Sequence, residues 1–390
     1  MATHPKPDPA RNKQPENIHK AGRGGWLFLL DSLGVGGSER KTIAAANILA
    51  NRGWNIHLAF LNLNYDLRNT LVPGIQTLDL GRSGKFDFSL VRNLERYIAE
   101  QEIRIVWSVN LYPMLYAFLA ARNIRKEVLL VGSSNVSRFR NRYERLKMRI
   151  YLPIIRRLDR FIFGSEGQMA EWKRRYSLDE AHYRVIHNGV DLSRFSVDAF
   201  GERKADARAR LDIADESIVL GMVAQFRAEK AHGDLLHAAQ KLADSELDVR
   251  VLFVGAGPTQ NATAELAEDL GIAPRVIFSG MTDDVRPALL AMDIFALTSV
   301  AVETFSNAAL EAMAMGLAAV LSDIGGAREM GEPGVNGYIY PPGDIAALTR
   351  ELRKLMEPTA RSVMGAASRK LVETKFSAEN MADDYEKAVT

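Results

Sequence analysis

The sequence TSVAVETFSNAALEAMAMGLAAVLSDIGGARE occupies residues 298–329 and is the most informative part of the chain. An apolar run at residues 294–297 comes before it and is short enough for a buried strand. Residues 308–315 favour a helix, which Gly316 would end with a left-handed cap. The stretch therefore predicts a strand, a loop and a helix in succession.

Two glutamates lie on either side of the expected helix start. Ser306 and Asn307 are typical N-cap residues, so Glu303 falls on the loop and Glu311 within the helix. The unpaired backbone N–H groups of a helix start bind anions. We therefore expect an anionic ligand here, with one carboxylate near each of its ends, although a solvated helix face would also carry two glutamates.

Two cations follow another expected strand, residues 218–223. Arg227 and Lys230 lie three residues apart between this strand and the next helix. Arginine offers a planar fork and lysine a point charge, so together they can neutralise the two phosphates of a nucleoside diphosphate. The alternative is an ordinary surface pair. Met281 lies in a loop after a further strand, residues 275–279.

A glycine turn near the start of the chain is a second candidate phosphate site. Gly36 and Gly37 come between a strand, residues 26–30, and a helix, and such turns bring backbone N–H groups against phosphates. A dinucleotide fingerprint is disfavoured because Glu39 occupies the place of its third glycine. The strand at 55–61 also supplies no acid for a ribose.

Strands and helices alternate along both halves of the chain, which predicts parallel sheets covered by helices. Further strands are expected at residues 75–80, 103–108, 128–131, 160–164 and 249–254, and helices at 89–100, 113–122, 167–176, 344–356 and 359–388. Ser134 and Asn135 follow the strand at 128–131, where such sheets bind ligands. They are acceptor candidates.

Residues 138–160 are strongly basic, with nine arginines and lysines against Glu144 and Asp159. On a helical projection several of the arginines share one face, among them Arg138, Arg142, Arg145 and Arg149. This segment is either a core helix with a solvated basic face or a surface that docks on anionic lipid or a lipid-linked diphosphate. Nucleic acid is disfavoured because no aromatic residues interleave the arginines regularly.

The composition sets the remaining limits. A chain of 390 residues exceeds one hydrophobic core and predicts two domains. The absence of cysteine excludes disulfides and thiolate metal sites. Residues 1–24 are proline-rich and polar, which predicts a disordered arm and not a signal peptide. We expect a cytoplasmic protein, peripheral to the inner face of the plasma membrane if the basic helix docks there.

The pattern S-x3-E-x-F-x5-E-A-M-A-x-G in residues 299–316, followed by D-x-G-G-x-x-E in 323–329, resembles the donor-binding segment of family 4 retaining nucleotide-sugar glycosyltransferases. The resemblance implies the α/β GT-B fold, in which two facing Rossmann-like domains, each with a parallel sheet, enclose a cleft. It places an acceptor domain at residues 25–195, a donor domain at 196–375, and a helix that crosses back at 376–390.

The resemblance also implies roles for the candidate residues. Glu303 would contact the donor sugar, Glu311 the ribose, and Arg227 and Lys230 the diphosphate. The other implied donor-binding residues are Gly36, Gly37, Met281, Phe305, Ser306 and Asn307. The chain departs from the family pattern at three positions: Gln225 where an arginine is usual, Ser134 where many relatives have histidine, and His187 where the hinge has proline. A catalytic His187 is the alternative to a hinge residue.

The expected activity is transfer of a hexose from a UDP- or GDP-sugar to a hydroxyl of a glycan or lipid-linked acceptor, with retention of configuration. By resemblance this would serve cell-surface polysaccharide, lipopolysaccharide or glycolipid synthesis. No cofactor is expected, and no divalent ion, because the chain has no Asp-x-Asp motif. The alternatives are a sugar-nucleotide epimerase or phosphorylase of the same fold, and a degenerate binding subunit.

Overall fold

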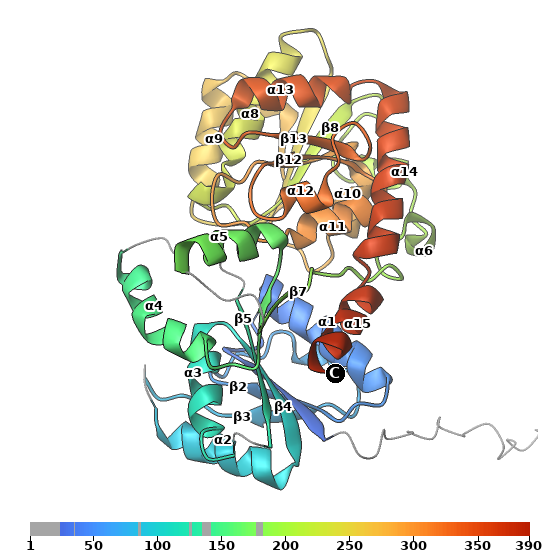
Figure 1. The fold of residues 1–390 in the computed structure, drawn as a ribbon. Helices are drawn as coiled ribbons and strands as arrows, with labels where there is room; N and C mark the ends of the chain where they lie inside the picture. The colour runs from blue at the N-terminus through green and yellow to red at the C-terminus, as the bar shows by residue number, and fades with distance from the viewer. Residues whose placement is uncertain (1–23, 35, 85–86, 125–126, 135–141, 177–181) are drawn as a thin grey trace, which may run out of the picture.

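The computed structural model describes residues 24–390 except 35, 85–86, 125–126, 135–141 and 177–181 (Figure 1). Of residues 142–147 it describes the backbone alone. The predicted arm at 1–24 therefore lies outside the described residues, apart from Gly24. None of the helices in the described ranges combines the length and the apolar character that crossing a bilayer requires.

The first sheet has seven parallel strands in the order β3-β2-β1-β4-β5-β6-β7. Its strands are β1 (Gly25–Leu30), β2 (Ile56–Phe60), β3 (Gln76–Asp79), β4 (Ile103–Val109), β5 (Leu129–Ser134), β6 (Arg160–Phe163) and β7 (Tyr183–Val185). The helices among them are α1 (Gly37–Asn51), α2 (Ser89–Glu100), α3 (Leu111–Ala120), α4 (Arg142–Ile155) and α5 (Glu166–Tyr176). The strand order reverses between β1 and β4, which marks an edge where parallel sheets bind ligands.

Helices cover both faces of this sheet, so β1 is buried throughout and apolar without alternation. Trp26 and Phe28 belong to the hydrophobic core on one face. Leu27 and Leu29 belong to the core on the other. The continuous apolar run that predicted this strand thus reflects burial on both sides.

The second sheet has six parallel strands in the order β10-β9-β8-β11-β12-β13. Its strands are β8 (Ile218–Val223), β9 (Val249–Val254), β10 (Val276–Phe278), β11 (Ile294–Leu297), β12 (Ala318–Ser322) and β13 (Gly337–Tyr340). The helices around it are α6 (Val197–Phe200), α7 (Lys204–Ala209), α8 (His232–Ala243), α9 (Gln260–Asp269), α10 (Arg286–Ala291), α11 (Asn307–Ala314), α12 (Ala327–Met330) and α13 (Ile345–Lys354). The sequence predicted β8, β9 and β11 with these bounds.

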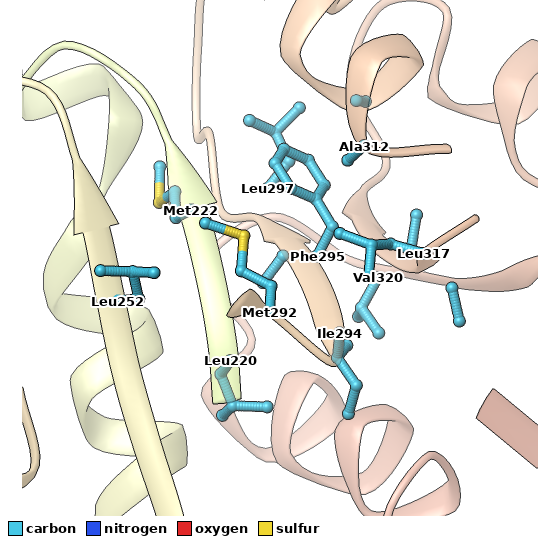
Figure 2. Packing of buried hydrophobic residues seen from close by; sticks show 14 of the residues in the cluster. Leu220, Met222, Leu252, Met292, Ile294, Phe295, Leu297, Ala312, Leu317 and Val320 are labelled. Carbon is cyan, nitrogen blue, oxygen red and sulfur yellow. The ribbon is translucent and has the colours of Figure 1, made fainter. Parts of the chain in front are cut away.

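The core of the second sheet is closely packed where β8 meets β11. Figure 2 shows Met292 lying against β8, beside Leu220 and Met222. Gly221 makes this possible, because a Cβ atom at that position would overlap the side chain of Met292. This packing sets the spacing of the two strands that lead to the candidate site.

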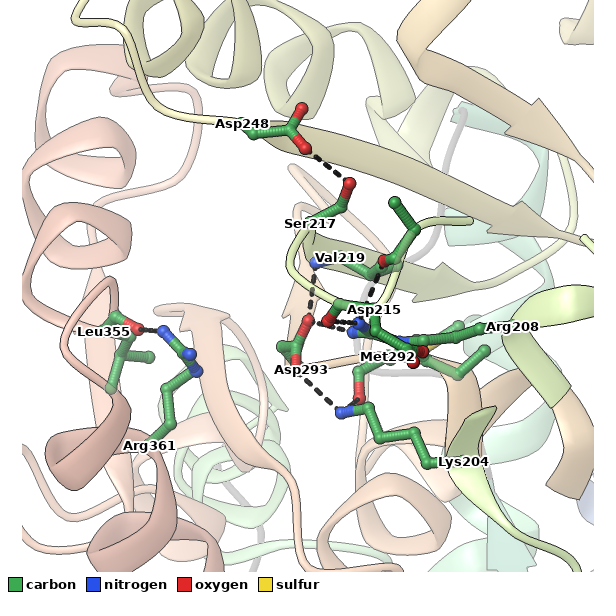
Figure 3. Close-up of polar contacts among 12 residues, drawn as sticks. Lys204, Arg208, Asp215, Ser217, Val219, Asp248, Met292, Asp293, Leu355 and Arg361 are labelled. Atoms are coloured by element: carbon green, nitrogen blue, oxygen red, sulfur yellow. Dashed lines mark hydrogen bonds and ion pairs between the residues drawn. The ribbon is translucent and has the colours of Figure 1, made fainter. Parts of the chain in front are cut away.

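A charged network attaches α7 to the second sheet (Figure 3). Asp293, just before β11, pairs with Lys204 and Arg208 and accepts a hydrogen bond from the backbone N–H of Val219. Arg208 is almost fully buried. Helix α7, which lies shortly after the expected domain boundary at residues 195–196, therefore packs with the second sheet.

The prediction of one continuous helix over residues 359–388 is wrong. The structure has α14 (Pro358–Lys375) and α15 (Ala378–Val389), separated at Phe376 and Ser377. The backbone N–H of Val190 donates to Phe376 O, and that of Ala378 donates to Val190 O. The break thus comes from pairing with a distant segment, and Ser377 then caps α15.

Helix α15 crosses to the first sheet and packs beside α1 (Figure 1). Arg52 at the end of α1 forms ion pairs with Glu379 and Asp383. The ring of Tyr385 stacks on Trp107 of β4, with their centroids 4.2 Å apart. The end of the chain is in this way anchored on the first sheet.

Candidate active site

Glu303 and Lys230 form the centre of the candidate site. Lys230 follows β8 and Glu303 follows β11, and these strands are neighbours where the order of the second sheet reverses. The Lys230 Nζ lies 2.6 Å from Glu303 Oε2, and both side chains are largely buried. Ser299 Oγ also donates to Glu303 Oε2, at 3.1 Å. The structure therefore brings two residues 73 positions apart into direct contact.

The backbone around this pair is held closely. Thr298 Oγ1 donates to the carbonyl oxygens of Lys230 and Ala231. The backbone N–H of Gly326 donates to Thr304 O, 2.7 Å away. Gly325 has a positive φ, and a Cβ atom there would overlap the carbonyl of Glu303. Gly325 and Gly326 thus allow the backbone that follows β12 to pack closely against the loop that carries Glu303.

Arg227, the second predicted cation, is exposed three residues before Lys230. In the part of the chain that the structure describes, its guanidinium has no hydrogen-bond or ion-pair partner. Its predicted contact with the donor diphosphate stays a prediction.

His232 lies next to this turn and has a structural role. It is buried, and its ring stacks on Phe226 with a centroid distance of 4.1 Å. Burial, with a further contribution from the charge of Lys230, lowers the pKa of His232 to about 4. The imidazole is therefore neutral at physiological pH, and it adds no charge to the site.

The start of α11 has the predicted cap, in which Ser306 Oγ accepts a hydrogen bond from Ala309 N at 3.2 Å. Phe305 just before it is buried, and its ring packs against His187 and Phe376. Its aromatic side chain therefore supports the loop, and its predicted contact with the donor stays a prediction.

The glycine turn of the first sheet faces this helix start. Asn307 Nδ2 donates to Gly37 O at 3.4 Å. Asn188 donates to both Asn307 Oδ1 and Phe305 O, at 2.7 and 2.8 Å. Gly36 is the N-cap of α1, directly before Gly37. The predicted phosphate-binding turn and the predicted anion-binding helix thus meet across the two sheets.

Glu311 borders a cavity of about 610 Å³ next to this contact. Arg40, Arg194 and Asn307 line the same cavity. Burial raises the pKa of Glu311 to about 7, although the charges of Arg40 and Arg194 act to lower it. Its carboxyl group has no hydrogen-bond or ion-pair partner among the described residues, so it faces the cavity without protein ligands.

Sequence reasoning missed the part that Glu329 plays between the two sheets. Its carboxylate accepts hydrogen bonds from the backbone N–H groups of Glu166 and Gly167 at the start of α5. Its Oε2 also lies 2.7 Å from His187 Nε2. Burial raises the pKa of Glu329, but these bonds outweigh burial and the net pKa is lowered. The glutamate in the sequence pattern was a signal, but its partners are far away in the chain.

The remaining predicted site residues are the acceptor or membrane candidates and Met281. Ser134 is buried at the end of β5, where its carbonyl accepts from Gln168 Nε2. Met281 is exposed in the loop after β10. Asn135 and Arg138 lie outside the described residues, as do the side chains of Arg142 and Arg145 on α4. Arg149 is exposed on the same helix.

Two family models match the chain, and together they span more than three quarters of it. The model described as Glycosyltransferase Family 4 matches residues 35–194, and that described as Glycosyl transferases group 1 matches residues 217–358. The first match covers the glycine turn, and the second covers the cations and glutamates of the candidate site.

Curated relatives match over part of their length. The chain is 30% identical over 204 residues to N-acetyl-alpha-D-glucosaminyl L-malate synthase of Bacillus anthracis, covering 52% of each chain. It is 31% identical over 282 residues to D-inositol 3-phosphate glycosyltransferase of Geodermatophilus obscurus, covering 67% of this chain and 59% of that one. The chain thus spans about half the length of the first curated relatives it matches.

Solved structures match over nearly the whole chain. Anabaena HepE in complex with UDP has a TM-score of 0.82 at 20% identity, covering 94% of this chain and 99% of that one. A glycosyltransferase from Rickettsia africae has a TM-score of 0.80 at 19% identity, covering 93% and 97%. With the two parallel sheets, this likeness confirms the predicted GT-B architecture.

Proposed function

Because the chain belongs to glycosyltransferase family 4, we propose that it transfers a hexose from a nucleoside-diphosphate sugar to an acceptor hydroxyl with retention of configuration. The observation that carries this proposal is the Lys230–Glu303 pair beside the Gly37–Asn307 contact. A cation, a carboxylate and the two backbone segments that the sequence predicts to bind phosphate come from both sheets.

The charges of the site suit departure of a nucleoside diphosphate. As the bond between the anomeric carbon and the diphosphate oxygen breaks, negative charge builds on that oxygen. Lys230, Arg227 and the helix start after Ser306 stabilise this charge, and a pre-oriented donor of this kind is worth ~2.7–4 kcal/mol of barrier. The acceptor oxygen bonds to the anomeric carbon, and its proton leaves with the nucleoside diphosphate. The two cations make a divalent ion unnecessary in this proposal.

The Lys230–Glu303 pair changes partners when the donor binds. Lys230 moves its hydrogen bond to a phosphate oxygen, which frees the Glu303 carboxylate to accept from the sugar hydroxyls. Glu311, next to the cavity, accepts from the ribose hydroxyls. The donor we propose is a UDP- or GDP-sugar, and the UDP complex of the similar Anabaena structure supports a uridine nucleotide.

The acceptor we propose is a glycan or a lipid-linked sugar, as in the synthesis of cell-surface polysaccharide, lipopolysaccharide or glycolipid. The basic helix α4 supports a membrane-bound acceptor, because Arg149 and the adjacent Ile150 are both exposed. Exposed apolar and cationic neighbours suit an anionic headgroup region. Charge reversal of Arg142, Arg145 and Arg149 should then release the protein from anionic liposomes, and unchanged binding would make α4 an ordinary solvated helix.

A thermal-shift screen with UDP-, GDP- and ADP-sugars tests the donor. Ligand at 100 times its Kd adds about 2.7 kcal/mol of stability, so the correct nucleotide should raise the melting temperature clearly. No stabilisation by any of them would overturn the proposal. Turnover without any acceptor would instead favour an epimerase or phosphorylase of the same fold.

A further inference from the structure

Four side chains outside the donor site meet at the carboxyl edge of the first sheet. Asp31 follows β1, Asn62 follows β2, Arg82 follows β3 and Tyr112 lies at the start of α3, after β4. These strands are consecutive neighbours in the sheet order β3-β2-β1-β4. The edge includes the reversal of strand order, which is where open parallel sheets bind ligands.

Main-chain hydrogen bonds hold the segments side by side. The backbone N–H of Asn62 donates to Asp31 O at 2.8 Å. That of Arg82 donates to Leu61 O at 2.6 Å. Asp31, Asn62 and Arg82 are therefore positioned by backbone hydrogen bonds directly after the strands, and not by a long loop.

Arg82 is a half-buried cation that the described residues do not neutralise. Its guanidinium carbon lies 4.8 Å from the centroid of the Tyr112 ring, and its Nη2 makes one long bond of 3.4 Å to Asn62 Oδ1. Its Nη1 is buried and has no hydrogen-bond partner, and the guanidinium has no ion pair in the described ranges. An uncompensated buried charge of this kind is costly, and its planar fork fits a carboxylate or phosphate.

Asp31 is the nearby group of opposite charge, but it does not pair with Arg82. Burial raises the pKa of Asp31 to about 6, while the charge of Arg82 lowers it and that of Glu39 raises it. The two side chains are thus close enough to interact, yet farther apart than the 4 Å of an ion pair. Tyr151 of α4 is buried near them, and burial together with Tyr112 and Asp31 raises its pKa.

We propose that Arg82 and Asp31 form an acceptor subsite for a hydroxylated anion. Arg82 holds a phosphate or carboxylate of the acceptor, and Asp31 accepts a hydrogen bond from one of its hydroxyl groups. The inference rests on the proposed function, because it assumes that the first sheet holds the acceptor. A purely structural Arg82, which only orients Asn62 and Tyr112, would bind no anion.

Inorganic phosphate is the first probe, measured by calorimetry with the full chain saturated with the nucleotide that stabilises it. Arg82→Met should weaken phosphate binding at least tenfold, whereas Arg82→Lys retains the charge and should keep part of it. Arg104→Met is the matched control, because Arg104 is an exposed arginine of the same sheet paired with Glu127. It should bind phosphate like the wild type. Equal phosphate binding by the wild type and Arg82→Met would overturn the subsite.

Asp31→Asn tests the second half of the proposal. Removing a neighbouring negative charge should leave phosphate binding intact or tighter. The same change should abolish the advantage of a polyol phosphate such as glycerol 3-phosphate over inorganic phosphate. A preference for the polyol phosphate that survives in Asp31→Asn would contradict the role of Asp31.

The chemical class of the natural anion is identified by measuring binding of three probes to the wild type and to Arg82→Met. The probes are a polyol phosphate, a hydroxy acid and vesicles that contain a lipid-linked diphosphate. Binding of any of these that depends on Arg82 supports the subsite and identifies its class. Binding of none, or binding that Arg82→Met leaves unchanged, overturns it. Failure of the proposed function looks different, since in that case no nucleotide stabilises the wild type at all.

Discussion

Lys230 and Glu303 are counter-charges of one another in the structure, and in the proposed function the donor separates them. Glu303→Gln keeps the shape of the side chain but frees the ammonium group of Lys230 for phosphate. We expect this variant to bind UDP at least as tightly as the wild type, if UDP is the donor nucleotide. Its transfer rate should fall by about 10²–10³, the usual loss for one group that stabilises the transition state.

Lys230→Met removes the positive charge of the Lys230–Glu303 pair and is the counterpart of Glu303→Gln. It should weaken nucleotide binding at least tenfold and also abolish transfer. Calorimetry with the free nucleotide and a transfer assay measure the two effects separately. If Glu303→Gln weakens nucleotide binding as much as Lys230→Met does, the pair acts as one structural unit and the exchange of partners is wrong.

The ribose contact proposed for Glu311 predicts that nucleotide binding depends on pH. Its folded pKa of about 7 means that the carboxyl group is half protonated near neutrality. Ribose hydroxyls donate to the ionised form, so nucleotide affinity should fall as the pH drops from 8 to 6. Glu311→Gln should bind more weakly and lose this pH dependence, which calorimetry at several pH values would show. An unchanged pH profile in the variant would remove Glu311 from the ribose site.

The same raised pKa has a consequence for stability. The folded protein binds more protons than the unfolded chain between the ordinary pKa of 4.5 and about 7, so this carboxyl group lowers stability as the pH rises through that range. Glu311→Gln should therefore raise the melting temperature of the ligand-free protein at pH 8 and have little effect at pH 4. The difference between 4.5 and about 7 corresponds to a gain of about 3 kcal/mol at pH 8, and an unchanged melting temperature there would contradict the raised pKa.

At the level of elements, α7 depends on the network around Asp293. Arg208→Met would leave the Asp293 carboxylate with Lys204 as its remaining ion-pair partner, and breaking a buried ion pair typically costs about 3–5 kcal/mol. We expect the free energy of unfolding to fall by about 3 kcal/mol, the lower end of this range, because Lys204 and the Val219 N–H still contact Asp293. Arg203→Met removes only an exposed pair with Asp206 and should not move the unfolding midpoint. Urea denaturation of both variants measures the difference.

Elements that local sequence determines were predictable, and those that distant contacts shape were not. Strands β8, β9 and β11 are apolar runs bounded by turn residues, so their bounds followed from the sequence alone. The break between α14 and α15 depends on Val190, almost 190 residues earlier, which no local pattern encodes.

The candidate site follows the same rule. Lys230, Glu303 and Gly37 each follow a strand, which made them candidate ligand-binding residues, and the family resemblance placed them in one donor site. Glu329 and Arg82 contact helix and loop residues from other parts of the chain, and no local pattern encodes those contacts.

At the level of the whole molecule, Glu329 joins the surroundings of the second sheet to the first. Its carboxylate bonds the start of α5 and His187 at the same time. Its pKa is lowered in the folded protein, so its contribution to stability is present above the ordinary carboxyl pKa and is lost as the pH falls through the folded value. Hydrogen bonds to a charged group are worth about 1.5–3 kcal/mol each, so we expect this junction to help fix how the two sheets face one another.

Glu329→Ala should therefore loosen the relative placement of the two sheets without unfolding either. We expect a larger radius of gyration in small-angle scattering, and a transfer rate that falls while binding of the free nucleotide to the second sheet changes little. Arg328→Met is the matched control, because Arg328 lies on the same short helix and, among the described residues, its side chain pairs only with Asp323 at the surface. If Glu329→Ala gave the same scattering and kinetics as Arg328→Met, other contacts, such as those of Asn307 with Asn188 and Gly37, would hold the orientation without Glu329.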